Sequence, residues 1–549
     1  MSFYPLENPI GFGASDFITL AITCLLVAAA IVWKPWLQPV YARFAERTVW
    51  CMLTLAALPV LLRLLLLPHH PAPSPDIYDE FSHLLVADTL RHFRLANPPH
   101  PFHRFFETFF VLQEPTYSSI YPLGQGIALA FGRMIFGNPW AGVVFFTAAF
   151  CSLSYWMLRA WTTPQWALAG GILAVIEFGP LNSWMNSYWG GSFAATGGCL
   201  VFGSLPRLKH SSQWRYGITL GVGLGMIVLT RPFESLFVFI SVLLYLAPIL
   251  KNRALWVTVV TLALIFGLIA RQNQRVTGSW TTLPYSLSQF QYGVPASLTL
   301  QPDAVPHRDL TPQQAMEYKA QLAFRTGKET LQSYLLRLEY RVRFYRFFFL
   351  PPLLVALLFY FATLRERRFL WVFLTVILFV LGINVFPAFE FHYLAPITPL
   401  FVLMAVIGLD RLSRIKTVGS EAAGVLIFLC ILQFAFWYSM HLLDPREMSR
   451  DLRQYETWNG INHQNPERRI VINYQVATIP GKILIFVHYS STHIFQEEWV
   501  YNQADIDNAR IVWARDLGPD ENEKLRAYYS DRQVYLLEPD FRPPRLHPY

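Results

Sequence analysis

Charged residues are scarce in this chain: they make up 15% of its 549 residues, whereas soluble domains carry roughly 25%. Hydrophobic residues make up 54% and aromatic residues 16%. This composition excludes an ordinary soluble globular protein and indicates a chain that lies largely in a membrane.

Cysteine is also scarce, and all five cysteines fall inside long apolar stretches, at Cys24, Cys51, Cys151, Cys199 and Cys430. The hydrophilic segments therefore contain no cysteine, which excludes a disulfide framework and a thiolate metal site in them. Segment 1–17 has neither a basic region nor a small-residue cleavage site, so we expect no signal peptide. The chain has no internal repeat and no low-complexity segment.

Apolar runs of the length needed to cross a hydrocarbon core about 30 Å thick recur along the chain. Helices satisfy their own backbone hydrogen bonds in lipid, so we expect these runs to be helices. We predict twelve spans, at 16–33, 50–67, 139–158, 165–181, 191–206, 216–230, 234–250, 254–270, 346–364, 369–386, 394–410 and 423–441. The segment 122–137 is apolar but short, and we expect a juxtamembrane helix there.

Basic residues are concentrated in the short loops that follow the first, third, fifth, seventh, ninth and eleventh predicted spans. The opposite short loops hold almost no Lys or Arg beyond Arg231. Because basic loops stay in the cytoplasm, both termini and the three long segments are expected outside it. The net charge of +8 is a topology signal, so we expect no nucleic-acid partner. The expected location is the inner (plasma) membrane, as a multi-pass protein.

The fold class predicted is mainly α: a polytopic helical membrane protein with about twelve spans and a small extracytoplasmic α/β domain at the C-terminus. The predicted parts are an N-terminal transmembrane pair (1–67), a first outer loop (68–138), a transmembrane bundle (139–270), a second outer loop (271–345), a second bundle (346–441) and the α/β domain (442–549).

In the α/β domain, four stretches rich in β-branched and aromatic residues predict strands: "RRIVINY", "KILIFVHY", "ARIVWARDL" and "QVYLLEP". The stretch "PDENEKLRAYYSDR" predicts a helix between the last two. The domain has no glycine-rich phosphate loop, so we assign it no nucleotide.

The first outer loop carries an adjacent acidic pair, Asp79 and Glu80, at the start of "DEFSHLLVADTLRHF". Apolar residues near helical spacing predict a helix here, lying along the membrane surface. His83 stands four residues after Asp79, so the two side chains can meet on one face. "NPPHPFH" ends the helix because proline removes backbone donors.

Other polar residues are predicted at the same membrane face. They are Asn186 and Tyr188 in "SWMNSYWGGS", Arg231 and Glu234 in "TRPFES", and Glu390, His392 and Tyr393 in "FPAFEFHYLAPITPL". Taken singly, an acidic pair is typical of a solvated helix start and an arginine of a headgroup anchor, while a histidine is as typical of packing as of a ligand. Gathered on one face, polar groups in apolar surroundings indicate a functional site.

The acidic pair in a long first outer loop, the following "SSIYPLGQG" and the late "HYLAPITP" resemble the GT-C membrane glycosyltransferases. Within them, the chain is similar to the aminoarabinose transferase and protein O-mannosyltransferase group. The matching positions are Asp79, Glu80, His392, Tyr393, Pro396 and Pro399. An extra span precedes the loop here, and His392 stands where the family often has Arg or Lys.

The resemblance implies transfer of a sugar from a polyprenyl-phosphate-linked donor to an extracytoplasmic glycolipid, glycan or protein acceptor. It implies an inverting single displacement, with Asp79 as the base and Glu80 as its supporting carboxylate. The candidate substrate-binding residues are His83, Arg133, Asn186, Tyr188, Arg231, Arg271, His392 and Tyr393, with Arg346 as a further cation for the leaving phosphate.

Three alternatives stay open at this point. A divalent metal held by Asp79, His83 and a third ligand is one, although the loop has no dense cluster of ligands. A lipid or lipid-linked sugar transporter is another, which would favour charges at mid-membrane; Glu177 is the main charge inside a predicted span. A non-catalytic envelope assembly protein that docks through 442–549 is the third.

Overall fold

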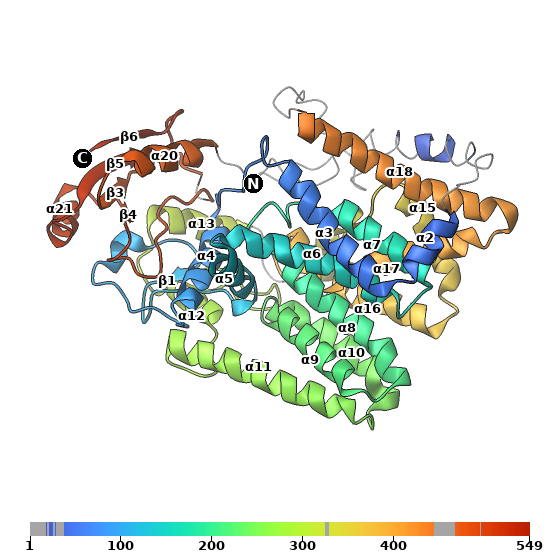
Figure 1. Ribbon diagram of the computed structural model, residues 1–549. Coiled ribbons are helices and arrows are strands. Elements are labelled where there is room, and N and C mark those ends of the chain that lie inside the picture. The colour runs from blue at the N-terminus through green and yellow to red at the C-terminus, as the bar shows by residue number, and fades with distance from the viewer. Residues whose placement is uncertain are drawn as a thin grey trace.

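The structure is a computed structural model that describes residues 38–323, 329–443, 467–494 and 496–549, together with residues 18, 21–25 and 28 near the N-terminus. The predicted span 16–33 lies mostly outside these residues. The described chain is largely helical, with one small mixed sheet at its C-terminal end (Figure 1).

Each predicted span from 50–67 to 423–441 falls on helix. The helices of the membrane part are α2 (Gln38–Ala45), α3 (Thr48–Leu65), α6 (Pro139–Leu158), α7 (Pro164–Phe178), α8 (Ser192–His210), α9 (Trp214–Val228), α10 (Pro232–Leu246), α11 (Ala254–Thr277), α15 (Leu353–Tyr360), α16 (Arg367–Ile383), α17 (Thr398–Ser413) and α18 (Lys416–Leu443). Six helices of the described chain are long and apolar enough to cross a membrane. The prediction of a polytopic helical membrane protein is confirmed.

One predicted span, 346–364, is broken. A short 3₁₀ helix, η3 (Arg343–Phe348), precedes α15, and the stretches Leu331–Phe348 and Leu353–Thr363 are bent by 111° relative to each other. Pro351 and Pro352 stand at the break. Proline offers no backbone N–H and clashes with the preceding turn, which explains why one straight span does not form here.

The outer segments add helices α4 (Tyr78–Arg91), α5 (Leu123–Phe136), α12 (Pro284–Tyr292), α13 (Pro312–Ala323) and α14 (Leu331–Val342), and a two-stranded ribbon of β1 (Val111–Leu112) and β2 (Ser118–Ser119). The helix predicted at 122–137 is therefore present as α5. The helix predicted after Asp79 is present as α4, and most of its residues are buried within the protein. Other outer segments and the C-terminal sheet unit cover it. The position of α4 along the membrane surface stays a prediction.

Glycines bring the helices beneath α4 into close contact. A Cβ on Gly142 of α6 would lie 1.8 Å from the carbonyl oxygen of Ala128 in α5. A Cβ on Gly126 of α5 would lie 2.1 Å from Cγ1 of Val86 in α4. Small residues allow such approaches between membrane helices, and here they seat α4 on α5 and α5 on α6.

The C-terminal sheet unit consists of α20 (Glu467–Thr478), β3 (Ile483–Val487), β4 (Ile511–Arg515), α21 (Pro519–Tyr528), β5 (Gln533–Glu538) and β6 (Arg545–Pro548). Its strand order is β4-β3-β5-β6, with β3 parallel to β4 and β5 and with β6 antiparallel to β5. The predicted strands at β3, β4 and β5 and the helix at α21 are confirmed.

The strand predicted at "RRIVINY" is wrong, because these residues belong to α20. Ile472 and Val476 are fully buried, four residues apart, while Ile470 and Val471 are exposed. The buried apolar residues thus follow a helical period. The strand was predicted from the β-branched residues alone, without regard to their spacing.

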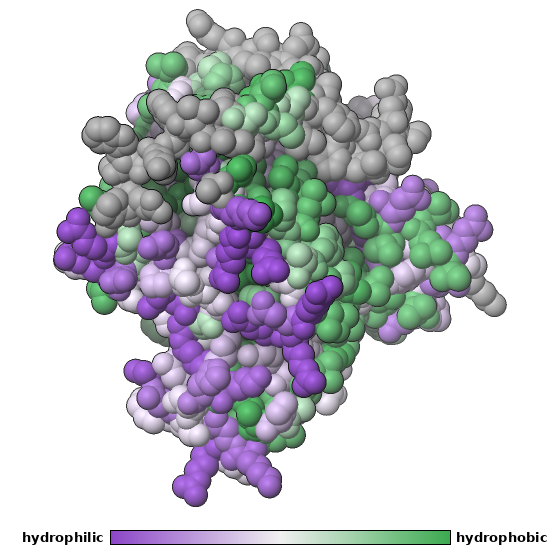
Figure 2. All heavy atoms as spheres, turned by 90° about the vertical axis from the view of Figure 1, so that its right-hand side faces the viewer, coloured by the Kyte–Doolittle hydropathy of each residue, from purple (hydrophilic) through white to green (hydrophobic). Residues whose placement is uncertain are grey.

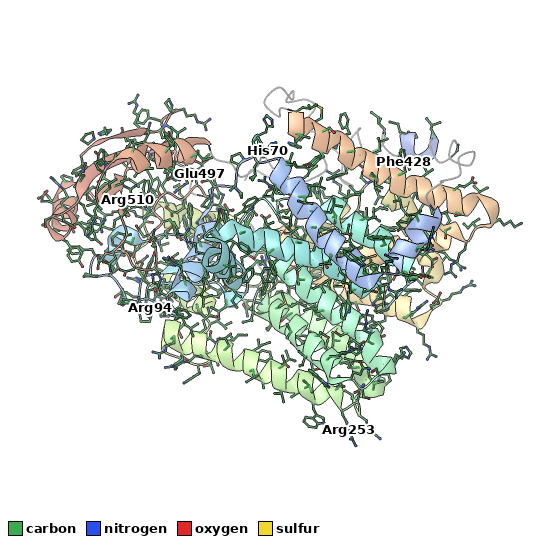
Figure 3. The ribbon with its side chains drawn as sticks, in the orientation of Figure 1. His70, Arg94, Arg253, Phe428, Glu497 and Arg510 are labelled. Atoms are coloured by element: carbon green, nitrogen blue, oxygen red, sulfur yellow. The ribbon has the colours of Figure 1, made fainter. Side chains whose placement is uncertain are left out.

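Exposed apolar side chains cover the membrane part. Trp256 and Leu264 of α11 are each 73% exposed, as expected of a helix that faces lipid. Figure 2 shows hydrophobic side chains beside charged ones at the end of the molecule that lies on the right in Figure 1. Arg253 lies at this end, whereas Arg94 and Arg510 lie at the other (Figure 3). The basic loop before α11 and the outer segments are therefore far apart, as the topology prediction requires.

Candidate functional site

Asp79 lies in the first turn of α4, where two half-buried aromatic residues contact its side chain. The hydroxyl of Tyr121, from the segment after β2, donates a hydrogen bond to Oδ1 of Asp79. The side chain of Trp189, from the loop before α8, also forms a hydrogen bond with Asp79. Segments far apart in the sequence thus converge on one carboxylate.

Arg231 supplies positive charge to this carboxylate from the junction between α9 and α10. Its guanidinium carbon lies 4.4 Å from the centre of the Tyr393 ring, and its Nη1 lies 3.7 Å from Oε1 of Glu234. Pro232 begins α10 directly after Arg231, a position that proline favours. The ring and the carboxylate hold the cation at the N-terminal end of α10.

Burial sets the protonation of the groups on α4. It raises the pKa of the Asp79 carboxyl to about 6, although Tyr121, Trp189 and the charge of Arg231 act in the opposite direction. Burial, together with Arg231, lowers the pKa of His83 to about 3. At neutral pH, Asp79 is therefore mostly ionised and His83 is neutral.

His83 stacks on Tyr121, with 4.2 Å between ring centres. Its Nδ1 atom is buried and has no hydrogen-bond partner. An unpaired buried nitrogen is costly, so this atom is available to a bound ligand.

Glu80 has a different environment from its neighbour Asp79. It is fully buried, and its two oxygens accept hydrogen bonds from the backbone N–H groups of Tyr188 and Asp76, each at 2.9 Å. Burial raises the pKa of Glu80 to about 7. The carboxyl group links the start of α4 to the loop before α8.

Asn186 and Tyr188 also hold this loop in place. The Asn186 amide donates to the carbonyls of Pro180 and Asn182 and accepts from Nε of the buried Arg63 at 2.6 Å. The Tyr188 hydroxyl donates to the carbonyl of Pro73. The loop that carries Trp189 is thus fixed on both sides.

The late motif reaches the same place through a 3₁₀ helix, η5 (Phe391–Ile397). The His392 ring lies 5.1 Å from the Trp189 ring, and Tyr393 lies beneath Arg231. Burial raises the pKa of Glu390 to about 7, and the nearby charge of Asp79 acts in the same direction. The structure therefore gathers Asp79, His83, Arg231, His392 and Tyr393.

Sequence reasoning missed Tyr121, Trp189 and Glu317. Glu317 of α13 is buried and accepts a hydrogen bond from the Tyr78 hydroxyl at 3.4 Å. Burial raises the pKa of Glu317 to about 7, and Asp79 contributes in the same direction. Tyr121 and Trp189 lie within the stretches "SSIYPLGQG" and "SWMNSYWGGS" quoted above, so the signal was present for these two. Nothing in the sequence marked Glu317.

Arg133, Arg271 and Arg346 have other surroundings. Arg133 is exposed at the end of α5 and donates to the carbonyl of Gly137, and Arg271 is exposed on α11. Arg346 lies 5.0 Å from the centre of the Phe347 ring. Their contact with a donor phosphate stays a prediction.

Among the described residues, no group of three or more His, Cys, Asp or Glu side chains could hold a metal ion. Asp79 and His83 therefore have no third protein ligand in this part of the chain. We derive no step through a metal.

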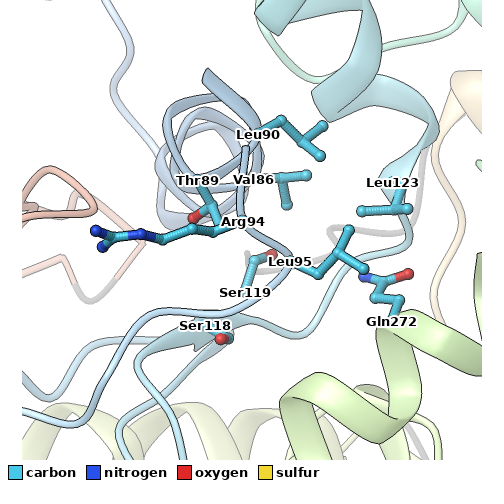
Figure 4. A pocket seen from close by; sticks show the side chains of 9 residues that line it. All are labelled: Val86, Thr89, Leu90, Arg94, Leu95, Ser118, Ser119, Leu123 and Gln272. Carbon is cyan, nitrogen blue, oxygen red and sulfur yellow. The ribbon is translucent and has the colours of Figure 1, made fainter. Parts of the chain in front are cut away.

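A small opening lies beside the second half of α4. Its cavity volume is only about 10 Å³, and it lies between α4, β2, α5 and α11. Val86, Leu90, Leu95 and Leu123 give it apolar walls, while Arg94 points away from it (Figure 4). This opening offers no charged group for chemistry.

No protein-family model matches the chain, and no curated protein matches it. Solved structures do. ArnT from Cupriavidus metallidurans bound to undecaprenyl phosphate is 12% identical, with a TM-score of 0.50 over 88% of this chain and 92% of that one. The same protein in the apo state is 13% identical, with a TM-score of 0.45 over 90% of this chain and 93% of that one. The apo oligosaccharyltransferase from Archaeoglobus fulgidus is 12% identical, with a TM-score of 0.42 over 89% of this chain and 69% of that one. The chain thus has a fold similar to that of ArnT, which is the kind of fold that the sequence resemblance predicts.

Proposed function

We propose that this protein is a membrane glycosyltransferase that moves a sugar from a polyprenyl-phosphate-linked donor to an acceptor on the extracytoplasmic side of the inner membrane. The observation that carries the proposal is the convergence of a half-buried carboxylate, Asp79, with a cation, Arg231, at the N-terminal end of a lipid-facing helix. The ArnT-like fold supports it, since that ArnT structure holds undecaprenyl phosphate.

Asp79 is the general base in this proposal. Its pKa of about 6 leaves it ionised at neutral pH yet basic enough to take a proton from an acceptor hydroxyl. As the proton leaves, the hydroxyl oxygen attacks the anomeric carbon and the bond to the lipid phosphate breaks with inversion. Tyr121 and Trp189 orient the carboxylate for this step.

Arg231 binds the leaving phosphate. Negative charge grows on the phosphate as the sugar departs, and a fixed guanidinium stabilises that charge. Glu234 and Tyr393 hold the guanidinium in place before the donor arrives.

The lipid tail of the donor fits the surface below Arg231. Leu236 is 52% exposed and Leu243 is 60% exposed along α10, which starts directly after Arg231. A polyprenyl chain on this apolar face keeps its tail in hydrocarbon while its phosphate meets the cation. His83, His392 and Tyr393 then lie on the sugar side of the site.

Glu80, Asn186 and Tyr188 act as positioning residues in this proposal. Their polar atoms are engaged with the backbone or with Arg63. Glu80 therefore supports Asp79 rather than taking the proton itself.

The test is mass spectrometry of glycolipids and glycoproteins from membranes of a deletion strain that carries the wild-type gene, Asp79→Asn or Asp410→Asn. Asp410, which pairs with Arg414 at the far end of α17, is the matched control. We expect the wild type and Asp410→Asn to restore a glycosylated species that Asp79→Asn does not. Restoration by Asp79→Asn, or no glycan difference between wild type and deletion, would contradict the proposal. In the second case, a difference in lipid-linked sugar distribution across the membrane would favour a transporter.

A further inference from the structure

A segment of the C-terminal sheet unit lies along α4. We call residues 497–504, which follow β3, the strap. Glu497 forms an antiparallel bridge with Ile77, and the backbone N–H of Glu498 donates to the Asp76 carbonyl at 3.1 Å. Near the other end of α4, the N–H of Ala504 donates to the Asp88 carboxylate at 2.7 Å.

Side chains fill the interval between these two ends. The Tyr501 ring lies 4.7 Å from the Phe81 ring, and the Tyr117 hydroxyl donates to the Asn502 carbonyl at 2.9 Å. The strap therefore follows α4 from the residues before its first turn to its last turn. Glu497 lies where the sheet unit meets the rest of the molecule (Figure 3).

The strap is in turn fixed to the sheet unit by the Glu498 carboxylate. It accepts hydrogen bonds from the Tyr489 hydroxyl and from the backbone N–H groups of Trp499 and Val500. Thr108 of the first outer loop donates to its other oxygen. Four donors thus hold one side chain at the junction.

Arg469 of α20 clamps the strap to α4. Its guanidinium carbon lies 4.6 Å from the centre of the Phe81 ring and 4.5 Å from that of Trp499, and it donates to the Glu498 carbonyl. The residue is buried. A desolvated cation between two aromatic rings is worth about 2 kcal/mol or more, so Arg469 couples α20, the strap and α4.

The contacts continue from the strap to Asp79. Asp76, whose carbonyl accepts from the strap, donates its own N–H to Glu80. Glu80 accepts on its other oxygen from Tyr188, the neighbour of Trp189, which is hydrogen-bonded to Asp79. Asp79 thus stands between two braced partners, the first turn of α4 and the loop before α8.

We propose that the strap is a positioning element of the transfer site: the C-terminal sheet unit holds the first turn of α4, and through Glu80 the Trp189 loop, in the geometry that Asp79 needs. This inference rests on the proposed function for its kinetic part. A misplacement of about 1 Å at a distance from the reacting atoms lowers a rate by up to about a hundredfold.

The test compares Arg469→Met with Arg532→Met in the full-length protein in detergent. Arg532 is a buried arginine of the same sheet unit, but it donates to the carbonyls of Asp507 and Ala509 and lies over Tyr529, all within that unit. Both changes remove a buried guanidinium, and only one touches the strap and α4. Hydrogen–deuterium exchange of the peptides that cover 76–92 and 183–192 is measured together with donor KM and kcat.

We expect Arg469→Met to raise deuterium uptake in both peptides and to lower kcat about tenfold at unchanged donor KM. Arg469→Lys, which keeps the charge over the two rings, should recover part of kcat. Arg532→Met should leave both peptides and kcat as in the wild type. If Arg469→Met does not fold, Tyr501→Leu, which removes the contact with Phe81, takes its place.

Unchanged uptake at 76–92 in a folded strap variant would overturn the inference, and so would an equal increase in Arg532→Met. A wild-type protein that transfers no sugar would defeat the proposed function instead, and the exchange data would still decide whether the strap holds α4.

Discussion

Two regions of the molecule gather the same kinds of residue around a carboxylate. Asp79 has Tyr121, Trp189 and Arg231 beside it, and Glu498 has Tyr489, Arg469 and Arg515. The Glu498 oxygens accept from two backbone N–H groups and two hydroxyls. Asp79 receives hydrogen bonds from the side chains of Tyr121 and Trp189 and from its own backbone N–H, and the neighbouring His83 has an unpaired nitrogen.

The difference between these surroundings indicates a structural role for Glu498 and a chemical role for Asp79. A carboxylate that accepts from four donors, as Glu498 does, is fixed in place and has little capacity for a substrate. One held by side-chain donors near a cation can exchange partners during a reaction. Charge alone does not distinguish the two sites, but the four donors on Glu498 and the unpaired nitrogen of His83 beside Asp79 do.

The largest expected effect is the difference in transfer rate between a variant of Asp79 and a variant of Glu498. Asp79→Asn keeps the shape of the side chain but removes the proton acceptor, so we expect the transfer rate to fall by about 10²–10⁴-fold with a normal melting temperature. Glu498→Gln should lower thermal stability clearly, because backbone donors lose a charged acceptor, while its rate falls far less. Transfer kinetics and thermal unfolding of both variants measure this. Equal rate losses would remove the distinction.

The next effect concerns the two cations. We expect Arg231→Ala to weaken undecaprenyl phosphate binding by about tenfold to a hundredfold, which corresponds to about 1.5–3 kcal/mol for a hydrogen bond to a charged group. Arg231→Lys should keep part of the affinity, since the point charge survives while the fork geometry is lost. Arg515→Ala should leave lipid binding unchanged. Titrations of each variant with undecaprenyl phosphate in detergent measure these affinities. An undiminished affinity in Arg231→Ala would mean that the phosphate binds elsewhere.

A smaller effect appears in the pH profile. Asp79 has a raised pKa of about 6, so the transfer rate should fall as the pH drops below about 6 and the base becomes protonated. Arg231 holds this pKa down, and Arg231→Gln should therefore move the acid limb to higher pH. The measurement is kcat/KM against pH for both proteins. A limb that stays in place, or moves to lower pH, would show that Arg231 does not act on the base.

The smallest effect belongs to an exposed ion pair of the sheet unit. On α21, Nζ of Lys524 lies 2.6 Å from Oε1 of Glu521, and both side chains are largely exposed. Such pairs are screened by water and contribute within about 0.5 kcal/mol. We expect Glu521→Gln to alter neither melting temperature nor transfer rate. A marked change would indicate that α21 takes part in a contact beyond this chain.

The membrane helices could be predicted from the sequence because lipid forces apolar runs into helices. The break at Pro351 and Pro352 and the helix at α20 could not. The break depends on the direction that the chain takes after the two prolines, which the sequence does not specify. At α20, β-branched residues that favour strands in isolation fold as a helix because Ile472 and Val476 pack into the sheet unit.

The candidate site could be predicted in part for a similar reason. Asp79, Arg231, His392 and Tyr393 stand at the outer ends of predicted helices, so topology alone brings them to one face. Glu317 lies in the middle of a long polar loop, and only the tertiary packing of α13 against Tyr78 brings it near Asp79. The burial that shifts the Asp79 pKa also depends on these distant segments.

The strap has a consequence for the synthesis of the protein. The contact between Asp88 and Ala504 joins residues 416 positions apart. At roughly 5–20 residues per second, α4 leaves the ribosome on the order of 20–80 s before its partner. Asp79 is translated before that interval, and the Trp189 loop and Arg231 are translated within it, while the segment that holds them comes later. A product truncated before the strap would therefore carry these chemical groups without the support that aligns them.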